Sequence, residues 1–424
     1  MIVCKFGGTS LSTAESFKRV ADILNSTPER RFAVVSAPGK RFELDKKVTD
    51  LLYNCFLSKD SERIALFEQI ADRFRLLHTE LFLSFDLEKN IDEYRRYLLE
   101  NNNIARFVSM GEHLSALLLS VYIDWDFVDA RKLIIFDDKN VCDYEETYRT
   151  AERVLSNYQK AVIPGFYGRN KQFRTVLFER GGSDITGSII ARATRANLYE
   201  NWTDVSGVYV VDPRIVKNAR IVKSLTYQEL RALSYSGASV IQPDAVFPTK
   251  DRIPIEIKNT FSPQVQGTII SNVPTKNELS LLGIVGKVGF SKLTANIGRT
   301  PKTEFLLDVF RTFARKGIQV ENVYIGIDEI SVFISQKSFD DNRSELFCQA
   351  KVPFDIVEHL ALVSIIGRGK GNKELYLSKS INVLSKEKIE FEIVGGNSTD
   401  ITIISCSQNE YEKVINLLYK ELNK

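Results

Sequence analysis

The sequence predicts an α/β protein in which helices cover both faces of a mostly parallel sheet, followed by two small ferredoxin-like α+β modules. Over about the first 270 residues, short apolar runs alternate with amphipathic helical patterns, which favours parallel strands joined by crossover helices. Beyond residue 275 a strand–helix–strand–strand order occurs twice, as ferredoxin-like modules do. At 424 residues the chain is also too long for one typical core.

Composition argues against several classes of protein. Lys and Arg number 57 against 54 Asp and Glu, a net charge of +3, so no basic excess calls for nucleic acid. No apolar run approaches the roughly 20 residues of a membrane span, and no secretory signal pattern is visible. The five cysteines are scattered and lack CxxC spacing, which indicates reduced thiols in a cytoplasmic protein. The three histidines are far apart, which argues against a histidine metal centre or a Ser-His-Asp triad.

The first predicted strand ends in a glycine turn. Residues 1–6 form an apolar run that carries Lys5, and Gly7 and Gly8 follow it. Residues 12–15 (STAE) match a capping box, and the apolar spacing beyond them predicts a helix. Strand, glycine turn and helix N-terminus together gather anions, so the segment suits a phosphate cradle. The alternative is an ordinary βα turn with a surface lysine.

The elements that follow keep the alternating order. A long amphipathic helix is predicted over 62–83, another helix over 104–122, and one that ends near 197. Strands are predicted at the following ranges: 31–36, 133–136, 161–163, 175–178, 198–203 and 253–257. Ligands of parallel sheets sit at the carboxyl ends of the strands. This order puts four polar residues there: Lys5, Ser36, Arg180 and Asp204.

Further polar residues stand where an anionic substrate could be held. Arg180 precedes a second glycine turn and could clamp a carboxylate or a phosphate through two hydrogen bonds. Asp184 could position a lysine or the metal–phosphate assembly, or simply cap its helix. Glu112 lies in an apolar helical segment and could bind an ammonium group, or be a partly exposed helical glutamate. Residues 203–204 suit a nucleoside-binding loop or a hairpin turn.

The usual phosphate-binding fingerprints are missing from the sequence. It contains no G-x-x-x-x-G-K-[ST] loop, no G-x-G-x-x-G motif and no protein-kinase H-R-D or D-F-G motif. A phosphotransferase built by this chain must therefore have another fold.

Four motifs, in order between residues 5 and 214, resemble those of aspartate kinases, and with the C-terminal modules the resemblance covers nearly the whole chain. Residues 5–10 (KFGGTS) resemble their KFGG(T/S)S opening, and residues 109–112 (SMGE) their S-x-G-E helix. Residues 179–184 (ERGGSD) resemble their R-G-G-S-D turn, and 202–214 their T-D-V-x-G-x-Y…D-P-R loop. The C-terminal modules look like the paired ACT domains that bind regulatory amino acids.

The resemblance implies an architecture. A catalytic domain of the amino-acid kinase fold would cover 1–272. A first ACT-like module would cover 278–345, completed by C-terminal elements, and a second would cover 346–424. No fused homoserine dehydrogenase is expected, and the modules would join the chain into a homodimer or a dimer of dimers.

The resemblance also implies a reaction. ATP would phosphorylate the side-chain carboxylate of L-aspartate, giving 4-phospho-L-aspartate for lysine or diaminopimelate, threonine and methionine synthesis. That carboxylate is already ionised at neutral pH, so no general base is needed. Mg²⁺ would be held mainly through the phosphates, and no metal-ligating residues are predicted.

Roles carry over residue by residue from the resemblance. The residues implied as catalytic are Lys5 and Asp184. Those implied for the substrate are Ser36, Thr49, Glu112, Arg180 and Ser183. Those implied for the nucleotide are Lys5, Gly7, Gly8, Thr203, Asp204, Tyr209, Asp212 and Arg214. The effector-binding residues would be Gln319 and Glu321, with lysine favoured as the inhibitor and threonine its rival.

One departure from the family pattern leaves alternatives open. Ser239 replaces a family lysine that usually assists nucleotide binding, and Gln242 replaces a histidine. A catalytically weak amino-acid sensor is therefore one rival interpretation. A related kinase that phosphorylates another carboxylate, of glutamate or acetylglutamate, is the other.

Overall fold

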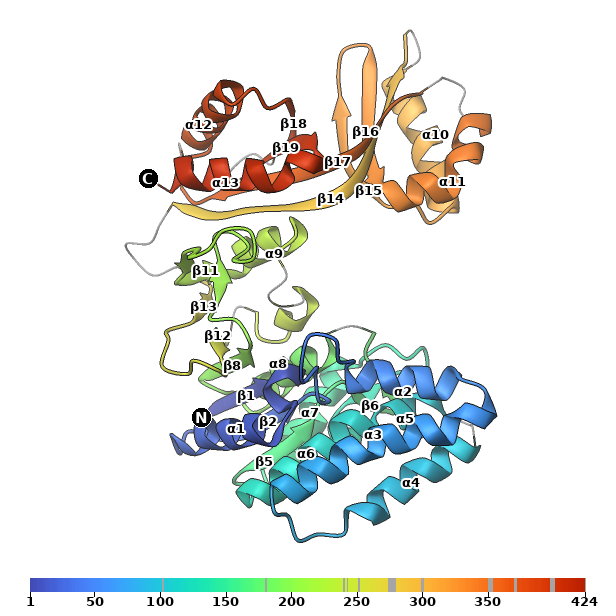
Figure 1. Cartoon of the computed structure of the whole chain (residues 1–424), viewed down its shortest axis with the longest axis vertical. Helices are drawn as coiled ribbons and strands as arrows, with labels where there is room; N and C mark the ends of the chain where they lie inside the picture. The colour runs from blue at the N-terminus through green and yellow to red at the C-terminus, as the bar shows by residue number, and fades with distance from the viewer. Residues whose placement is uncertain are drawn as a thin grey trace. The chain divides into compact units, whose positions relative to one another are not determined.

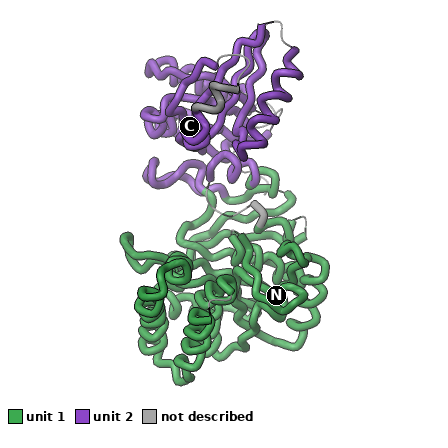
Figure 2. Tube along the Cα trace, turned by 90° about the vertical axis from the view of Figure 1, so that its right-hand side faces the viewer, with its two compact units in different colours: residues 1–208, 223–230, 239–276 green, residues 209–222, 231–238, 277–424 purple. Residues whose placement is uncertain are grey.

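The computed structural model divides into two compact units. It describes the following residues: 1–100, 103–179, 181–238, 241, 243–250, 252–273, 280–298, 301–349, 354–369, 372–396 and 401–423. The first unit comprises 1–208, 223–230 and 239–276, and the second comprises 209–222, 231–238 and 277–424 (Figure 2).

The first unit is built on an eight-stranded sheet of order β11-β13-β12-β8-β1-β2-β5-β3 (Figure 1). Its strands are β1 (Ile2–Phe6), β2 (Arg30–Val35), β3 (Asp126–Phe127), β5 (Ala161–Pro164), β8 (Leu198–Thr203), β11 (Ser224–Thr226), β12 (Ile255–Asn259) and β13 (Thr268–Ser271). The described neighbours pair in parallel except β12 and β13. The predicted mostly parallel sheet is confirmed.

Helices cover both faces of this sheet. They are α1 (Ala14–Asn25), α2 (Val48–Leu57), α3 (Asp60–Glu80), α4 (Leu87–Glu100), α5 (Ile104–Val108), α6 (Met110–Ile123), α7 (Tyr144–Leu155) and α8 (Gly182–Ala193). Apolar residues of α1 to α6 share one core with Cys4 and Phe6 of β1. Successive strand residues point to opposite faces, so Lys5 points to the other face, where its side chain meets α8.

Three local predictions needed correction. The first helix is capped by Thr13, whose hydroxyl accepts the Ser16 N–H at 3.2 Å, one residue later than the capping box predicted. The helix predicted over 104–122 is divided at Ser109 into α5 and α6. The strands predicted at 133–136 and 175–178 contribute β4 (Ile135–Phe136) and β7 (Thr175–Leu177) to a separate three-stranded sheet with β6 (Tyr167–Asn170).

The segment Ile104–Ile123 is long and apolar enough to cross a membrane by length and composition alone. It contains Arg106, Glu112 and His113. Within its most apolar stretch of 18 residues, 72% is buried inside the structure. Phe107, Leu114 and their apolar neighbours belong to the core described above. We interpret it as a core helix pair.

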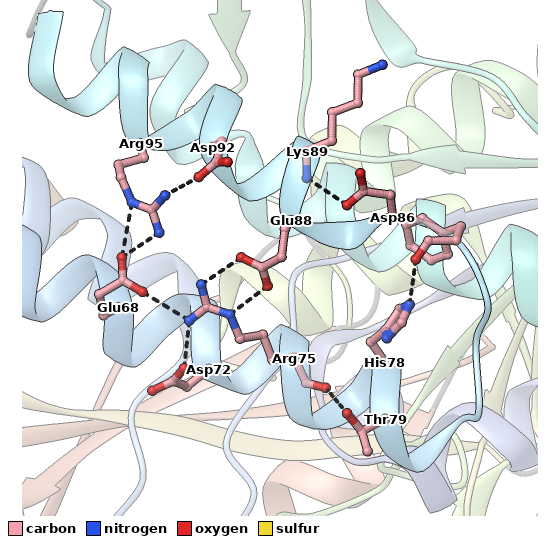
Figure 3. Close-up of polar contacts among 11 residues, drawn as sticks. Glu68, Asp72, Arg75, His78, Thr79, Asp86, Glu88, Lys89, Asp92 and Arg95 are labelled. Carbon is pink, nitrogen blue, oxygen red and sulfur yellow. Dashed lines mark hydrogen bonds and ion pairs between the residues drawn. The ribbon is translucent and has the colours of Figure 1, made fainter.

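Helices α3 and α4 form a hairpin held by exposed ion pairs (Figure 3). The Arg75 guanidinium donates to both carboxylate oxygens of Glu88 across the hairpin, at 2.7 and 2.9 Å. It also donates to Glu68 at 3.0 Å, and Arg95 of α4 reaches the same carboxylate at 2.7 Å. Each helix thus contributes an arginine that binds a glutamate of the other helix.

The second unit contains a six-stranded antiparallel sheet of order β15-β16-β14-β17-β19-β18. Its strands are β14 (Leu281–Asn296), β15 (Val320–Ile325), β16 (Glu329–Ser335), β17 (Phe354–Gly367), β18 (Phe391–Gly395) and β19 (Ile401–Ser407). Its helices are α10 (Lys302–Arg315), α11 (Gln336–Gln349), α12 (Asn372–Lys386) and α13 (Tyr411–Leu422). The repeated strand–helix–strand–strand order is present, and α11 was not predicted.

The long strands β14 and β17 serve both repeats. The second half of β14 pairs with β16, the second half of β17 pairs with β19, and the two strands pair with each other along nearly their whole length. Segments 209–222 and 231–238 pack with this unit, and they include β10 (Ile221–Val222) and the end of α9 (Tyr227–Tyr235).

Candidate active site

A buried ion pair joins β1 to α8 at the carboxyl edge of the sheet. Lys5 is 7% exposed, and its Nζ lies 2.6 Å from Oδ1 of Asp184. Asp184 lies in the first turn of α8, and Gly181 before that helix has a left-handed backbone with φ of 60°, which glycine adopts without strain. The helix dipole at this end favours negative charge, so the site can hold an anion beside the lysine ammonium.

The loops that follow β1 and β2 touch backbone to backbone. The Gly39 N–H donates to the Gly8 carbonyl at 2.7 Å. A Cβ on Gly8 would lie 2.8 Å from the Ala37 carbonyl oxygen, and one on Gly39 would lie 2.7 Å from the Gly8 carbonyl carbon. Only glycine fits at either position without a shift of the backbone.

Three strand ends converge on the same edge. The Gly7 N–H donates to the Trp202 carbonyl of β8 at 3.1 Å. The Ser36 N–H, at the end of β2, donates to the Phe6 carbonyl at 3.2 Å. Ser36, Gly7 and the end of β8 are therefore neighbours, as the sequence predicted for residues at the carboxyl ends of parallel strands.

Glu112 lies in the first turn of α6 and is 4% exposed. Burial raises the pKa of its carboxyl group to about 8, against a smaller lowering by the Ala37 N–H, which donates to it. Its Oε2 has no hydrogen-bond partner among the described residues. A buried polar oxygen without a partner is costly, so a ligand that brings a hydrogen-bond donor would be favoured here.

Close packing brings Glu112 to the loop after β2. A Cβ on Gly111 would lie 2.6 Å from the Ala37 side chain and 3.4 Å from Val48 at the start of α2. Thr49, the next residue of α2, is half-buried. Of the predicted substrate residues, Ser36, Thr49 and Glu112 thus come from segments that pack together.

The second glycine turn is equally close-packed. Ser183 is 9% exposed, and a Cβ on Gly165 would lie 2.7 Å from it. A Cβ on Gly182 would meet the Phe166 ring at 2.7 Å. The turn is therefore fixed against the loop after β5. Arg180, the predicted clamp of a carboxylate, lies outside the described residues, as do Ser239 and Gln242.

The predicted nucleotide residues divide between the two units. Thr203 ends β8, and its hydroxyl donates to the exposed Asp204 carboxylate at 3.2 Å. Tyr209, Asp212 and Arg214 fall in the second unit, where the guanidinium donates to Asp212 at 2.6 Å. That contact holds the pKa of the Asp212 carboxyl below its ordinary value. Asp212 and Arg214, two of the predicted nucleotide residues, thus form an ion pair with each other on an exposed loop.

Of the two predicted effector residues, Glu321 lies in a charged cluster. Its carboxylate is 2.7 Å from the Nζ of Lys287 on β14, and that ammonium also lies 4.9 Å from the centre of the Tyr235 ring. Gln319 is exposed just before β15. The cluster lines a cavity of about 20 Å³, which holds about one water molecule in this conformation.

Sequence reasoning missed several residues of these sites. Asn201 on β8 donates to the Asp184 carboxylate at 3.0 Å. Its position next to Lys5 follows from the parallel pairing of β1 with β8, so the alternation of strand 198–203 could have indicated it. Gly39 and Lys287 meet their partners only through long-range folding, and no local pattern marks them.

Among the described residues, no group of three or more His, Cys, Asp and Glu side chains could hold a metal ion. Mg²⁺ usually keeps several waters and binds through substrate phosphates. The described residues therefore form no dedicated magnesium cage.

A lysine–aspartate pair and two glycine turns, one of them at a helix N-terminus, lie at the carboxyl edge of this sheet and can hold an anion there. The family model for the amino acid kinase family matches residues 1–259. Aspartokinase 3 of Bacillus subtilis (strain 168) is 31% identical over 455 aligned positions, which cover 99% of this chain and 98% of that protein. The chain therefore belongs to the amino acid kinase family and, within it, to the aspartokinases.

Solved structures support this assignment. The aspartate kinase of Clostridium acetobutylicum, described as an allosteric enzyme, has a TM-score of 0.87 and 33% identity, and covers 100% of this chain and 99% of its own. Aspartokinase III of E. coli, solved in complex with aspartate and ADP, has a TM-score of 0.80 at 23% identity and covers 100% of both chains. At that identity the likeness shows the fold alone.

Proposed function

We propose that the chain transfers the γ-phosphoryl group of ATP to the side-chain carboxylate of L-aspartate, and that Glu112 selects the substrate. The observation that carries this proposal is the buried Oε2 of Glu112, which lacks a partner among the described residues. An ammonium group would supply both a donor and the charge that stabilises the ionised carboxylate. Aspartate and ADP are bound together in the E. coli aspartokinase III structure.

The reaction needs alignment and charge stabilisation more than proton transfer. A carboxylate oxygen of aspartate attacks the γ-phosphorus, the bond to the β–γ bridging oxygen breaks, and ADP leaves with that electron pair. Lys5 would stabilise the negative charge on the transferring group, and Asp184 would orient its ammonium. Gly7 and Gly8, which have no side chains, would let the phosphates come close to the backbone, and bound Mg²⁺ would neutralise phosphate charge.

The remaining predicted contacts complete the site. Arg180 would bind the α-carboxylate of aspartate, with Ser36, Thr49 and Ser183 beside the substrate. The residues proposed to line the nucleotide site are Thr203, Asp204, Tyr209, Asp212 and Arg214. The catalytic domain would span 1–272.

The glutamate proposal is tested by Glu112→Gln. This change keeps the shape of the side chain and removes the charge that would hold the ammonium. We expect the KM for aspartate to rise by at least about 100-fold, since charge-assisted pairs in a buried site are worth about 3 kcal/mol or more, while the KM for ATP changes little. Glu15→Gln on the exposed face of α1 is the matched control. An unchanged aspartate KM would contradict the role of Glu112.

We also propose that lysine inhibits the enzyme through the second unit, with threonine as the rival effector. E. coli aspartokinase III has been solved in complex with lysine and aspartate in a T-state. In the present chain Glu321 already binds a primary ammonium, that of Lys287. An effector would displace this side chain and use the same carboxylate, with Gln319 beside it. Millimolar lysine that leaves the activity unchanged would contradict this proposal.

For the oligomeric state, the cellular location and the pathway, the proposal is the one that the sequence predicts. The two ACT-like modules, 278–345 and 346–424, would join chains into a homodimer or a dimer of dimers. A cytoplasmic enzyme is favoured by the four thiols that the structure describes as free, Cys4, Cys55, Cys142 and Cys406. Its product would enter lysine or diaminopimelate, threonine and methionine synthesis.

A further inference from the structure

The Asp184 carboxylate is held by β8 as well as by Lys5. Strand β8 runs parallel to β1, and Asn201 pairs in register with Lys5. Asn201 is 3% exposed, and its Nδ2 donates to Oδ1 of Asp184 at 3.0 Å. The Lys5 ammonium lies 2.6 Å from that same oxygen. A single carboxylate oxygen therefore accepts from two donors on neighbouring strands.

A second residue of β8 holds the backbone of the same aspartate. Tyr199, two residues before Asn201 and on the same face of the strand, donates its hydroxyl to the Asp184 carbonyl at 3.2 Å. The ring is fully buried, and a Cβ on Gly187 would come within 2.5 Å of the hydroxyl oxygen. The first turn of α8 is thus fastened to β8 at both the main chain and the side chain of Asp184.

The other side chains of β8 have different partners. Glu200 and Trp202 point to the opposite face, where Glu200 binds the Arg30 guanidinium through both oxygens, at 2.7 and 2.9 Å. A buried amide at the centre of a strand is costly unless it is hydrogen-bonded. Among the described residues, the Asn201 amide finds its hydrogen-bond acceptor in Asp184.

We propose that Asn201 is a positioning residue for phosphoryl transfer, fixing the Asp184 carboxylate so that it orients the Lys5 ammonium. This inference rests on the roles proposed for Lys5 and Asp184. An ammonium has three donors, and one directed at a fixed oxygen leaves the other two aimed at the transferring group. Without the amide, the carboxylate can rotate about its side chain and carry the ammonium with it. Small errors of position at a reacting centre lower the rate steeply.

The first test is Asn201→Leu, which keeps the branched shape and removes the donor. We expect kcat to fall about 10- to 100-fold, while the KM for aspartate stays within about twofold because Glu112 is unaffected. Asn197→Leu, at an exposed position just before β8, is the matched control and should keep the wild-type kcat. A folded Asn201→Leu enzyme with the wild-type kcat, or one that loses only aspartate affinity, would overturn the proposal.

The second test is Asn201→Asp, which separates positioning from packing. Two carboxyl groups in contact cannot both ionise easily, so the pKa of one rises. Below that pKa the protonated carboxyl donates a hydrogen bond to Asp184 as the amide does, and activity should return toward the wild-type value. Above it a second negative charge faces Lys5 and the phosphates, so kcat should fall as the pH rises. A pH profile of kcat parallel to that of the wild type would overturn the proposal, even if Asn201→Leu does not fold.

Lys5→Ala distinguishes this inference from the proposed function. If wild type forms aspartyl phosphate, Lys5→Ala does not, and both Asn201 variants behave like wild type, the inference alone fails. If Lys5→Ala is fully active, the roles proposed for Lys5 and Asp184 fail as well.

Discussion

Glu112 carries a pKa of about 8 because it is buried, so substrate binding should depend on pH. Aspartate binds productively only to the ionised carboxylate, and below pH 8 most of the free enzyme holds a proton there. We expect kcat/KM for aspartate to rise nearly tenfold per pH unit up to about pH 8 and then level off. Steady-state kinetics from pH 6 to 9 measures this. Glu112→Gln should lose the dependence, and a flat wild-type profile would refute the pKa.

The same group should lower stability at alkaline pH. The folded pKa, about 8, lies above the ordinary value of 4.5, so between these values the folded state retains a proton that the unfolded chain releases. The contribution to the free energy of unfolding therefore falls as the pH rises from about 4.5 to 8 and is constant above. We expect Glu112→Gln to raise Tm by several degrees at pH 8.5 and to leave it nearly unchanged at pH 5. Equal shifts at both pH values would count against this account.

At the scale of single elements, the α3–α4 hairpin shows what exposed charges contribute. The Arg75 guanidinium, bound to both oxygens of Glu88, holds the pKa of that carboxyl below its ordinary value. The stability this pair supplies is present above the unfolded pKa and lost as the pH falls through the lowered folded pKa. Exposed pairs are worth about 1 kcal/mol or less, and salt screens them.

We therefore expect Arg75→Met to lower Tm by about 1–3 °C at pH 7. The difference should shrink in 0.5 M salt and vanish only at a pH low enough to protonate all the carboxylates that Arg75 binds, those of Glu88, Glu68 and Asp72. Arg149→Met, which removes an isolated pair with Glu146 within α7, should have a smaller effect. Calorimetry at two salt concentrations measures the change in Tm. A change that persists in high salt would indicate lost packing instead of lost charge.

Local pattern predicted most elements, because strand and helix periods are properties of neighbouring residues. The strands of the parallel sheet and the repeated order beyond residue 280 follow from such periods. Which sheet a strand joins depends on distant partners, so the strands at 133–136 and 175–178 were assigned to the wrong one. Likewise Ser109 divides a helix whose apolar pattern runs on unbroken.

The candidate site likewise combines features that the local sequence shows with contacts that depend on distant partners. Glycine turns and the glutamate in an apolar helix are visible in the sequence, and Lys5 and Asp184 are contributed by two such segments. What lay beyond local pattern were pairings across the fold: Asn201 with Asp184, Gly8 with Gly39, and Lys287 with Glu321. Each joins residues at least 17 positions apart, whose proximity depends on how strands pair.

At the scale of the whole molecule, an amino acid bound by the second unit should change the activity of the first. Such coupling requires that the effector bind one of two states more tightly. In the present chain Lys287 occupies the Glu321 carboxylate, so it competes with any incoming ammonium group. Removing this competitor should increase effector affinity.

We accordingly expect Lys287→Met to lower the lysine concentration for half-inhibition by about two- to fivefold, the value of a partly exposed ion pair. Glu321→Gln should abolish inhibition without changing kcat in the absence of lysine. Lys292→Met, which breaks the neighbouring pair between β14 and Glu392 of β18, is the matched control. Inhibition curves for the three variants settle the point. Unchanged sensitivity of Glu321→Gln would place the effector elsewhere.

The central claim is that this site phosphorylates aspartate and selects it by its ammonium and carboxylate groups. Trapping the acyl phosphate with hydroxylamine, in the presence of ATP and Mg²⁺, measures that reaction directly. We predict ATP-dependent hydroxamate from L-aspartate, and at least about 100-fold less from succinate and N-acetyl-L-glutamate, which lack a free ammonium group. Absence of hydroxamate from aspartate, or an equal rate with succinate, would contradict the account.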